Sequence, residues 1–426
     1  MNNRWNILKI GQLFFLIVSA VSAQSWSEQN FANLITAVVI APEQEKVLAD
    51  ALIKYTREKR SVSQSTCILF EEFPELKKHF SYIQLAQLPT PVETIKVDNV
   101  DLFYIKRDDM TSDIFGGNKV RKLEFLLADA RARDVDTVMT FGCVASSHAT
   151  ATAIHAKNLG MHSILVLMPQ KNSYMVHRNL LLNKKVNADM VLAMNKEVRA
   201  VKAPHAFFEH YSKTGEYPYV IPTGGSCPIG ILGYVNAAFE LKNQIKEGIL
   251  QEPDIIYLPI GSCGTVAGLL LGLKAAGLKS KIMAISVVPN QNVAFTNKVN
   301  ALISSTNELL HNADTTFPII KYSKKDLEIR NDFAGTCYGV FTKEGQEAKE
   351  IFENELGIIL DGVYSAKAAA ALIDDINKGI LKGKKVLFWN TFCGHDFSKI
   401  VENVSYKDLP EDFHNYFERP VQELDC

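Results

Sequence analysis

A lysine that follows two glycines is the residue of this chain best suited to covalent chemistry. Lys119 lies in the run FGGNKVRKLE, 115–124, where Gly116 and Gly117 permit a tight turn and the apolar spacing beyond predicts a helix to about Arg133. Lys119 is therefore expected where a loop meets a helix. A lysine there is either a solvated charge or an amine that burial and nearby cations keep partly neutral and nucleophilic. The residue alone leaves both interpretations open.

Four other stretches have the composition of a small-residue turn that leads into a helix. They read GCVASSHA, PTGGSCPIGILG, PIGSCGTVAGLLLG and LDGVYSAKA, and an alternating strand, LFYIKRDDM, precedes the lysine. Together with FGGNKVRKLE, they make the chain resemble the family of pyridoxal-phosphate enzymes that contains D-cysteine desulfhydrase and 1-aminocyclopropane-1-carboxylate (ACC) deaminase. The resemblance covers roughly residues 102–397. It implies that Lys119 forms the Schiff base with the cofactor, pyridoxal 5'-phosphate.

Short apolar runs rich in β-branched residues recur from residue 101 onward and alternate with helical stretches. They read DTVMTFG, HSILVLM, ADMVLAM, DIIYLPI, KIMAISV and KKVLFW. Near-continuous apolar strands between helices indicate parallel sheets covered on both faces, so the pattern predicts an α/β fold with a doubly wound sheet. The resemblance implies fold type II, which is tryptophan synthase β-like, with the cofactor in the cleft between two such domains. It implies a small domain at 123–225 and a large domain at 64–122 and 226–420.

The turn at 261–272, GSCGTVAGLLLG, follows an apolar strand and opens a predicted helix. Backbone N–H groups converge in such a turn, and the helix dipole adds positive charge, so the turn can bind a phosphate. Close packing explains the glycines equally well. The resemblance implies a phosphate cup formed by the backbone of Gly261, Ser262 and Gly264 and by the Thr265 hydroxyl. It also implies a phosphate contact from Lys122, for which a solvent-facing charge is the alternative.

Three polar residues are predicted beside the cofactor ring and the substrate. Asn118 is placed to hydrogen-bond the phenolic oxygen of the cofactor, although an Asn beside Gly-Gly also forms turns. Ser146 and Ser147 precede a predicted helix, where serines commonly cap, and the same hydroxyls and free N–H groups can bind a substrate carboxylate. The resemblance implies a substrate contact for Ser146. It implies a ring contact at position 147, where Ser147 replaces the family's Asn, while His148 keeps the family's histidine.

Two tyrosines and two smaller hydroxyl residues complete the predicted site. Tyr338 and Tyr364 match the family's active-site tyrosines, and a phenol there can stack on the ring, hold a carboxylate or transfer a proton; packing is the alternative. Ser365 and Thr391 stand where ACC deaminases have Glu and Leu and where D-cysteine desulfhydrases have Ser or Thr. A hydroxyl does not keep the pyridine nitrogen protonated as a carboxylate does. Elimination of a good leaving group is therefore expected rather than the opening of a cyclopropane.

These inferences predict a pyridoxal-phosphate-dependent α,β-elimination on a small amino acid. D-Cysteine is the first candidate, with pyruvate, ammonia and hydrogen sulfide as products, and ACC deaminase activity is the alternative within the family. A non-catalytic protein that binds an amino acid or the cofactor is the alternative from another class, suggested by Ser147 and by a possible export signal. The family's tendency to dimerise predicts a homodimer.

Residues 1–23 have the layout of a secretory signal peptide. Two positive charges precede an apolar run, 10–21, that ends at small residues, and the run is shorter than the ~20 residues of a membrane-spanning helix. Cleavage after Ala23 predicts a periplasmic or secreted protein without a stable membrane span. An uncleaved anchor and a buried N-terminal helix are the alternatives, and a protein that is not exported would be cytoplasmic. Residues 24–63 form an N-terminal extension that carries no functional signal.

The composition argues against several other classes of protein. The chain has 426 residues, 47% of them hydrophobic and 22% charged, as in an ordinary globular protein of about two domains. A formal net charge of -1 and dispersed Lys and Arg residues give no basis for a nucleic-acid partner. The seven cysteines include no CxxC pair, and no His/Cys cluster has metal-ligand spacing, so no metal site is predicted. Partly buried free thiols are expected in the turns of the site at Cys143, Cys227, Cys263, Cys337 and Cys393.

Overall fold

The computed structural model describes residues 67–98, 100–323 and 325–423. The predicted signal peptide, 1–23, and the predicted extension, 24–63, lie outside the described residues. Among the residues that are described, no helix is both long enough and apolar enough to cross a membrane.

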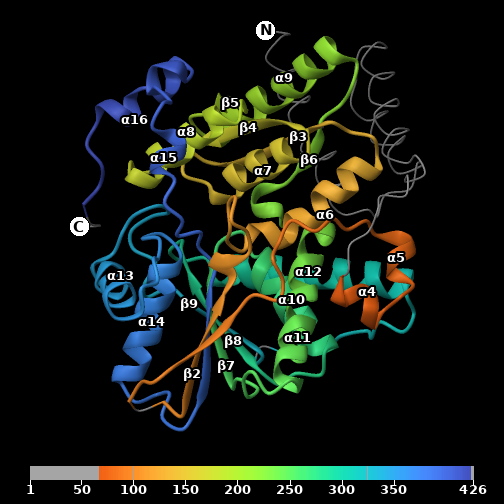
Figure 1. Ribbon diagram of the computed structural model, residues 1–426, viewed down its shortest axis with the longest axis vertical. Coiled ribbons are helices and arrows are strands. Elements are labelled where there is room, and N and C mark those ends of the chain that lie inside the picture. The colour runs from red at the N-terminus through yellow and green to blue at the C-terminus, as the bar shows by residue number, and fades with distance from the viewer. Residues whose placement is uncertain (1–66, 99, 324, 424–426) are drawn as a thin grey trace.

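Two separate sheets organise the described chain (Figure 1). Their strands are β1 (Val92–Ile95), β2 (Leu102–Arg107), β3 (Thr137–Cys143), β4 (His162–Met168), β5 (Asp189–Leu192), β6 (Tyr219–Ile221), β7 (Ile255–Ile260), β8 (Lys281–Ser286), β9 (Leu327–Arg330) and β10 (Lys385–Asn390). The four-stranded sheet has the order β5-β4-β3-β6 and is parallel throughout. The six-stranded sheet has the order β1-β2-β10-β7-β8-β9, and its edge strand β1 pairs with β2 in the antiparallel direction. The predicted α/β fold with parallel sheets is confirmed.

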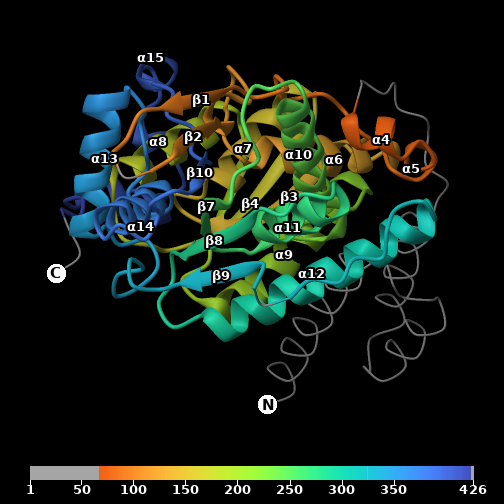
Figure 2. The ribbon, with the colours of Figure 1, turned by 90° about the horizontal axis from the view of Figure 1, so that it is seen from below.

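Helices pack against both sheets. They are α4 (Ile68–Glu72), α5 (Leu76–His79), α6 (Lys119–Ala132), α7 (Ser147–Asn158), α8 (Tyr174–Lys185), α9 (Lys196–Thr214), α10 (Pro228–Lys246), α11 (Gly264–Ala275), α12 (Asn292–Ala313), α13 (Lys343–Leu356), α14 (Ser365–Asn377), α15 (Ser398–Val401) and α16 (Asn415–Glu418). In Figure 1 the four-stranded sheet occupies the upper half and the six-stranded sheet the lower half. Figure 2 shows the long helix α12 along one side of the molecule, where its far end approaches α5.

Alternate residues of the central strand β10 face two different cores. Leu387 and Trp389 belong to the cluster that contains α10 and α11, whereas Val386 and Phe388 belong to the cluster that contains α13 and α14. Successive side chains of a strand point to opposite faces of the sheet, so a strand covered on both faces must be apolar at every position. This requirement explains the four apolar residues at the end of KKVLFW, which the structure places between helices on both sides.

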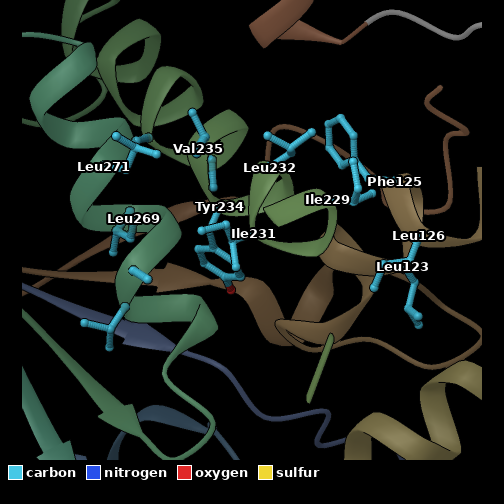
Figure 3. Packing of buried hydrophobic residues seen from close by; sticks show 14 of the residues in the cluster. Leu123, Phe125, Leu126, Ile229, Ile231, Leu232, Tyr234, Val235, Leu269 and Leu271 are labelled. Atoms are coloured by element: carbon cyan, nitrogen blue, oxygen red, sulfur yellow. The ribbon is translucent and has the colours of Figure 1, made fainter. Parts of the chain in front are cut away.

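Three helices, α6, α10 and α11, form the centre of the largest core (Figure 3). Helix α10 is buried over nearly its whole length, as expected of a helix surrounded by other elements, and its buried Glu240 pairs with Lys106 and Arg121. Its closest contact is with α6, because a Cβ atom on Gly233 would lie 2.0 Å from the backbone oxygen of Arg121. Helix α6, which begins at Lys119, therefore packs tightly against α10 in this core.

Candidate active site

A cavity of about 360 Å³ lies where segments that follow strands of both sheets converge. Cys143 ends β3, Met168 ends β4, Gly261 follows β7 and Thr391 follows β10. The carboxyl ends of parallel strands are where α/β proteins usually bind ligands. Most of the predicted site residues line this cavity, namely Asn118, Lys119, Ser146, Ser147, Gly261, Ser262, Thr265, Tyr338, Tyr364 and Thr391. Lys122, Gly264 and Ser365 are not among the lining residues.

The loop that presents Lys119 depends on its two glycines, as the sequence predicted. Gly117 has a φ of +93°, which side chains rarely permit, and a Cβ atom on it would lie 2.9 Å from the Thr391 oxygen. A Cβ atom on Gly116 would lie 2.3 Å from the oxygen of Asp109. The N–H of Gly117 donates to the Asp108 oxygen at 2.9 Å, which fixes the turn. The chain can therefore make this approach only with glycine at both positions.

The amine of Lys119 lies in the cavity with a lowered proton affinity. Burial lowers its pKa to about 8, and the carboxylate of Asp361 opposes that change. The Nζ atom donates to Oδ1 of Asn118 at 2.8 Å and lies 5.9 Å from the ring centre of Tyr364. The Nδ2 atom of Asn118 donates in turn to Oγ1 of Thr265 at 3.0 Å. An amine with a pKa near 8 is partly neutral at physiological pH, as a nucleophile must be.

The second lysine of the motif is a buried amine that forms no ion pair with a carboxylate among the described residues. Lys122 is fully buried, and its Nζ donates to the backbone oxygen of Gly224 at 3.0 Å. Burial, together with the Lys119 and Lys298 cations, holds the pKa of Lys122 well below its usual range. An anion placed beside these three amines would relieve their mutual repulsion. The predicted alternative of a solvent-facing charge is excluded by the burial.

The N-terminus of α11 lies directly beside the Lys122 amine. A Cβ atom on Gly264 would lie 2.9 Å from Nζ of Lys122 and 2.5 Å from Oγ of Ser226, so the helix begins in direct contact with both side chains. The Gly264 N–H donates to Oγ of Ser226 at 3.2 Å. The following N–H groups of the first turn have no partner within the helix. Such a helix start beside a buried cation suits a phosphate group.

A buried histidine also has an unused acceptor in the cavity. Oγ1 of Thr140 donates to the oxygen of Ile221 at 2.9 Å, so Nε2 of His148 must donate to Thr140, at 3.0 Å. Nδ1 is then an acceptor, and it has no hydrogen-bond partner among the described residues. Buried polar atoms are normally paired. This atom, the Lys122 amine and the start of α11 together fit pyridoxal 5'-phosphate, which would be held by Lys119 through its carbonyl carbon and by Lys122 and α11 through its phosphate.

Ser146 caps the helix that follows it and keeps a free hydrogen. Its Oγ accepts from the N–H of Ala149 at 3.1 Å, which confirms the predicted cap of α7. Because Oγ acts as the acceptor there, its hydrogen remains available to a ligand. Ser147 and His148 begin the helix and line the cavity beside it. A substrate carboxylate can therefore bind at this helix start.

The two predicted tyrosines form a hydrogen-bonded pair. Their hydroxyl oxygens are 2.9 Å apart and their rings meet edge to face with 6.1 Å between the centroids. Burial raises the pKa of both Tyr338 and Tyr364, so both phenols stay protonated at neutral pH. The Tyr364 ring also lies against Gly261, where a Cβ atom would be 3.0 Å from Cε1. A proton donor thus lies beside the predicted phosphate turn and the lysine.

The hydroxyl of Ser365 is already engaged within the protein. Ser365 is fully buried at the start of α14, and its Oγ donates to Oδ1 of Asp361 at 2.7 Å. The predicted contact of Ser365 with the pyridine ring therefore stays a prediction, and Thr391 is the hydroxyl residue that lines the cavity directly.

Several cavity residues were not predicted from the sequence. Asp361, Arg199 and Lys298 line it, and a carboxylate four residues before the helix of LDGVYSAKA was the available signal for Asp361. Arg199 and Lys298 lie on predicted helical stretches without a motif. Among the predicted thiols, Cys143 and Cys263 line the cavity, whereas Cys337 is exposed and not partly buried as expected. No group of three His, Cys, Asp or Glu residues in the described part of the chain is placed to hold a metal ion.

Comparison with known proteins points to the same cofactor as the geometry of the cavity. Residues 83–391 match the family model described as pyridoxal-phosphate dependent enzyme. A mitochondrial bifunctional D-cysteine desulfhydrase/ACC deaminase from Arabidopsis thaliana is 36% identical over 322 residues, 72% of this chain and 77% of that protein. A Pyrococcus abyssi protein, provisionally named an ACC deaminase, is 35% identical over 320 residues, 74% of this chain and 92% of that protein.

A solved structure extends the similarity to the fold. The crystal structure of an ACC deaminase homologue has a TM-score of 0.64 and 32% identity to this chain, and the match covers 80% of this chain and 100% of the other. The two parallel sheets and the cavity at their carboxyl ends are those of fold type II. The chain therefore belongs to the family of pyridoxal-phosphate-dependent enzymes that includes ACC deaminase and D-cysteine desulfhydrase.

Proposed function

We propose that this enzyme catalyses α,β-elimination on a small amino acid and that D-cysteine is converted to pyruvate, ammonia and hydrogen sulfide. The observation that carries this choice is the pair of hydroxyl residues, Ser365 and Thr391. D-Cysteine desulfhydrases have Ser or Thr at both positions. The Asp361 carboxylate beside Ser365 accepts hydrogen bonds from three backbone N–H groups, of Val363, Tyr364 and Ser365, and from the Ser365 hydroxyl.

Different residues of the cavity would carry out the different steps of such an elimination. Bound pyridoxal phosphate supplies an electron sink for the electron pair left at Cα of the substrate. Lys119 would hold the cofactor and, with substrate bound, would take the proton from Cα, for which its pKa of about 8 is well suited. Tyr364 lies within reach of Lys119, and its phenol, paired with Tyr338, protonates the departing group.

The substrate is oriented by the start of α7. The Ser146 hydroxyl donates to the α-carboxylate, and the positive end of the helix dipole attracts the same charge. Asn118 holds the Lys119 amine in place and is itself fixed by Thr265. The reactive amine and the carboxylate site thus have a defined separation, which is the condition for selecting one substrate orientation.

ACC deaminase activity is the second candidate, because relatives with that name match most of the chain. It is disfavoured by the hydroxyl residues at positions 365 and 391, since opening a cyclopropane calls for a strongly electron-withdrawing ring.

Export through cleavage after Ala23 remains part of the proposal, and N-terminal sequencing of the mature protein tests it. Homodimer formation is likewise proposed from the family's tendency.

The test is product analysis with purified protein loaded with pyridoxal phosphate. D-Cysteine, L-cysteine and ACC are supplied in parallel, and pyruvate, sulfide and 2-oxobutyrate are measured. We expect pyruvate and sulfide from D-cysteine and no 2-oxobutyrate from ACC. Lys119→Ala should abolish turnover and change the absorbance of the bound cofactor. Turnover that survives Lys119→Ala, or 2-oxobutyrate as the main product, would overturn the assignment.

A further inference from the structure

The last described segment of the chain, residues 406–423, connects the two halves of the molecule. We call this segment the C-terminal strap. Its side chains Leu409 and Phe413 are buried in the core cluster that contains α7 and α8, the helices that pack on the four-stranded sheet. From α16 the strap runs toward α13, which belongs to the other half (Figure 1). One end of the strap is therefore fixed to the small sheet, and the other end reaches the large one.

The loop before α8 anchors the middle of the strap. The side-chain Nδ2 of Asn172 donates to three backbone oxygens, those of Tyr416, Arg419 and Pro420, at 2.8, 3.0 and 3.2 Å. The backbone oxygen of Asn172 accepts in turn from the N–H of Gln422 at 2.9 Å. The backbone of the strap near Gln422 thus has a defined position relative to α8.

The side chain of Gln422 binds the loop between β9 and α13. Its Oε1 accepts from the N–H of Phe341 at 3.2 Å, and its Nε2 donates to the oxygen of Gly339 at 2.8 Å. A side-chain amide supplies one acceptor and two donors, so glutamine satisfies both backbone groups, whereas a carboxylate could satisfy only Phe341. Gly339 itself has a φ of +90°, a conformation that favours glycine. The loop is thereby held in one arrangement from outside.

This loop carries one member of the tyrosine pair into the cavity. Tyr338 directly precedes Gly339, lines the cavity, and has its hydroxyl 2.9 Å from that of Tyr364. Tyr364 is fixed locally, because its N–H donates to Asp361 at 2.8 Å and α14 begins at the next residue. Tyr338 lies outside any helix or strand. The position of its hydroxyl therefore depends on what holds its loop.

We propose that Gln422 is a positioning residue that holds Tyr338 against Tyr364 during the elimination. The inference rests on the proposed function. When the Cβ–S bond breaks, the sulfur leaves with its electron pair as hydrosulfide, and the Tyr364 proton converts it to hydrogen sulfide. A hydrogen bond donated by Tyr338 stabilises the phenolate that Tyr364 then becomes. Gln422 acts through Tyr338 and does not line the cavity.

The proton transfers are balanced with water as the only further reactant. Lys119 takes the proton from Cα, and that proton returns to Tyr364 before the next turnover. Water replaces the nitrogen of the released enamine. D-Cysteine and water thus give pyruvate, ammonia and hydrogen sulfide, with no oxidation or reduction.

The experiment compares two substrates that differ in whether the leaving group takes a proton. Enzyme loaded with pyridoxal phosphate is assayed for pyruvate from D-cysteine and from the D-enantiomer of β-chloroalanine, whose chloride leaves without a proton. Gln422→Ala should lower kcat for D-cysteine by about 10-fold, because a misplaced tyrosine pair transfers its proton poorly. KM for D-cysteine and turnover of β-chloroalanine should change little. A general loss of structure would instead lower the turnover of both substrates.

The neighbouring residue supplies a matched control. Glu423 is exposed, has a side chain of similar length and does not line the cavity. Glu423→Ala alters the same segment and should leave both substrates unaffected. An equal loss for both substrates in Gln422→Ala, or a loss of the same size in Glu423→Ala, would overturn the proposal.

Hydrogen exchange separates this inference from the elimination itself. The Phe341 N–H donates to Gln422, so its exchange in the loaded enzyme should be about 10-fold faster in Gln422→Ala and unchanged in Glu423→Ala. This measurement requires no turnover. If neither substrate reacts, the proposed function fails, and faster exchange at Phe341 still supports Gln422 as the residue that holds the Tyr338 loop. Exchange that is the same in the wild type and in Gln422→Ala would overturn that role.

Discussion

The hydroxyl of Ser365 donates a 2.7 Å hydrogen bond to Oδ1 of Asp361, which lines the cavity and faces the charge of Lys119. The same carboxylate accepts from the first N–H groups of the turn into α14. The residue that the sequence singled out as a ring contact thus fixes a carboxylate that acts on the reactive amine. This relationship gives the first prediction.

Asp361→Asn should shift the ionisation of Lys119 to lower pH. Burial lowers the pKa of Lys119 to about 8, and the Asp361 charge keeps it from falling further, so removing that charge removes the opposing effect. In protein stripped of cofactor, the rate of borohydride-trapped attachment of pyridoxal phosphate to Lys119 should rise with pH, with a midpoint near 8 in the wild type. The midpoint should lie lower in Asp361→Asn.

The control for this shift is Ser365→Ala, which removes a hydrogen bond and retains the carboxylate charge. Its midpoint should stay close to that of the wild type. Equal midpoints in the wild type and Asp361→Asn would show that the carboxylate does not act on Lys119.

Thr265→Val should weaken cofactor binding. The substitution removes the acceptor of the 3.0 Å hydrogen bond from Asn118, leaves a buried amide hydrogen without its partner, and frees the residue that holds Lys119. A loss of about 1 to 2 kcal/mol, or roughly 5- to 30-fold in affinity, is expected. Titration of the stripped protein with pyridoxal phosphate measures it. Thr306→Val, at a buried hydroxyl of α12 with no hydrogen-bond partner among the described residues, should leave the affinity unchanged.

Gly117→Ala should disrupt both folding and the site. The added Cβ atom would be 2.9 Å from the Thr391 oxygen at a φ of +93°, so the substitution combines backbone strain with a steric clash. Gly160→Ala supplies the comparison, because Gly160 has a φ of +76° and nothing within 4 Å of an added Cβ atom. Chemical denaturation should show a loss of about 1 kcal/mol for Gly160→Ala and a clearly larger loss for Gly117→Ala. Equal losses would contradict the close approach to Thr391.

Glu124→Gln should alter the pH dependence of stability. Burial raises the pKa of Glu124 from 4.5 to about 7, so the folded protein holds this proton more tightly than the unfolded chain. The resulting stabilisation is complete below pH 4.5 and is lost as the pH rises to about 7, with a total of about 3 kcal/mol. Glutamine does not titrate, so the unfolding free energy of the Glu124→Gln protein, relative to that of the wild type, should increase across this pH range.

The geometry permits this substitution. Oε1 of Glu124 accepts from Tyr82, Leu85 and Ala86, and a glutamine oxygen can accept the same bonds, while Oε2 has no hydrogen-bond partner among the described residues. Denaturation curves at pH 5 and pH 8 provide the measurement. A difference between the two proteins that is the same at both pH values would show that Glu124 is charged throughout.

Much of the fold and the centre of the site followed from local sequence. The glycines before Lys119, the cap at Ser146 and the long buried strands each depend on spacing within one element, which the chain displays directly. The run HSILVLM coincides with β4, and the other five apolar runs differ from the observed strands by one or two residues at an end, whereas LFYIKRDDM extends three residues beyond β2. The short edge strands β1, β6 and β9 were not predicted, because three or four residues give too short a pattern.

Tertiary structure alone decided which of these local features act on one another. The sequence left a solvent-facing charge open for Lys122, yet in the folded chain its side chain is fully buried beside the start of α11. Asp361 and Lys119, more than two hundred positions apart, meet because the turn before α14 and the loop before α6 both reach the same cavity. Arg199 reaches that cavity from the other sheet. Spacing along the chain fixes the shape of each element, whereas the charges that tune the amine come from elements that only the folded chain brings together.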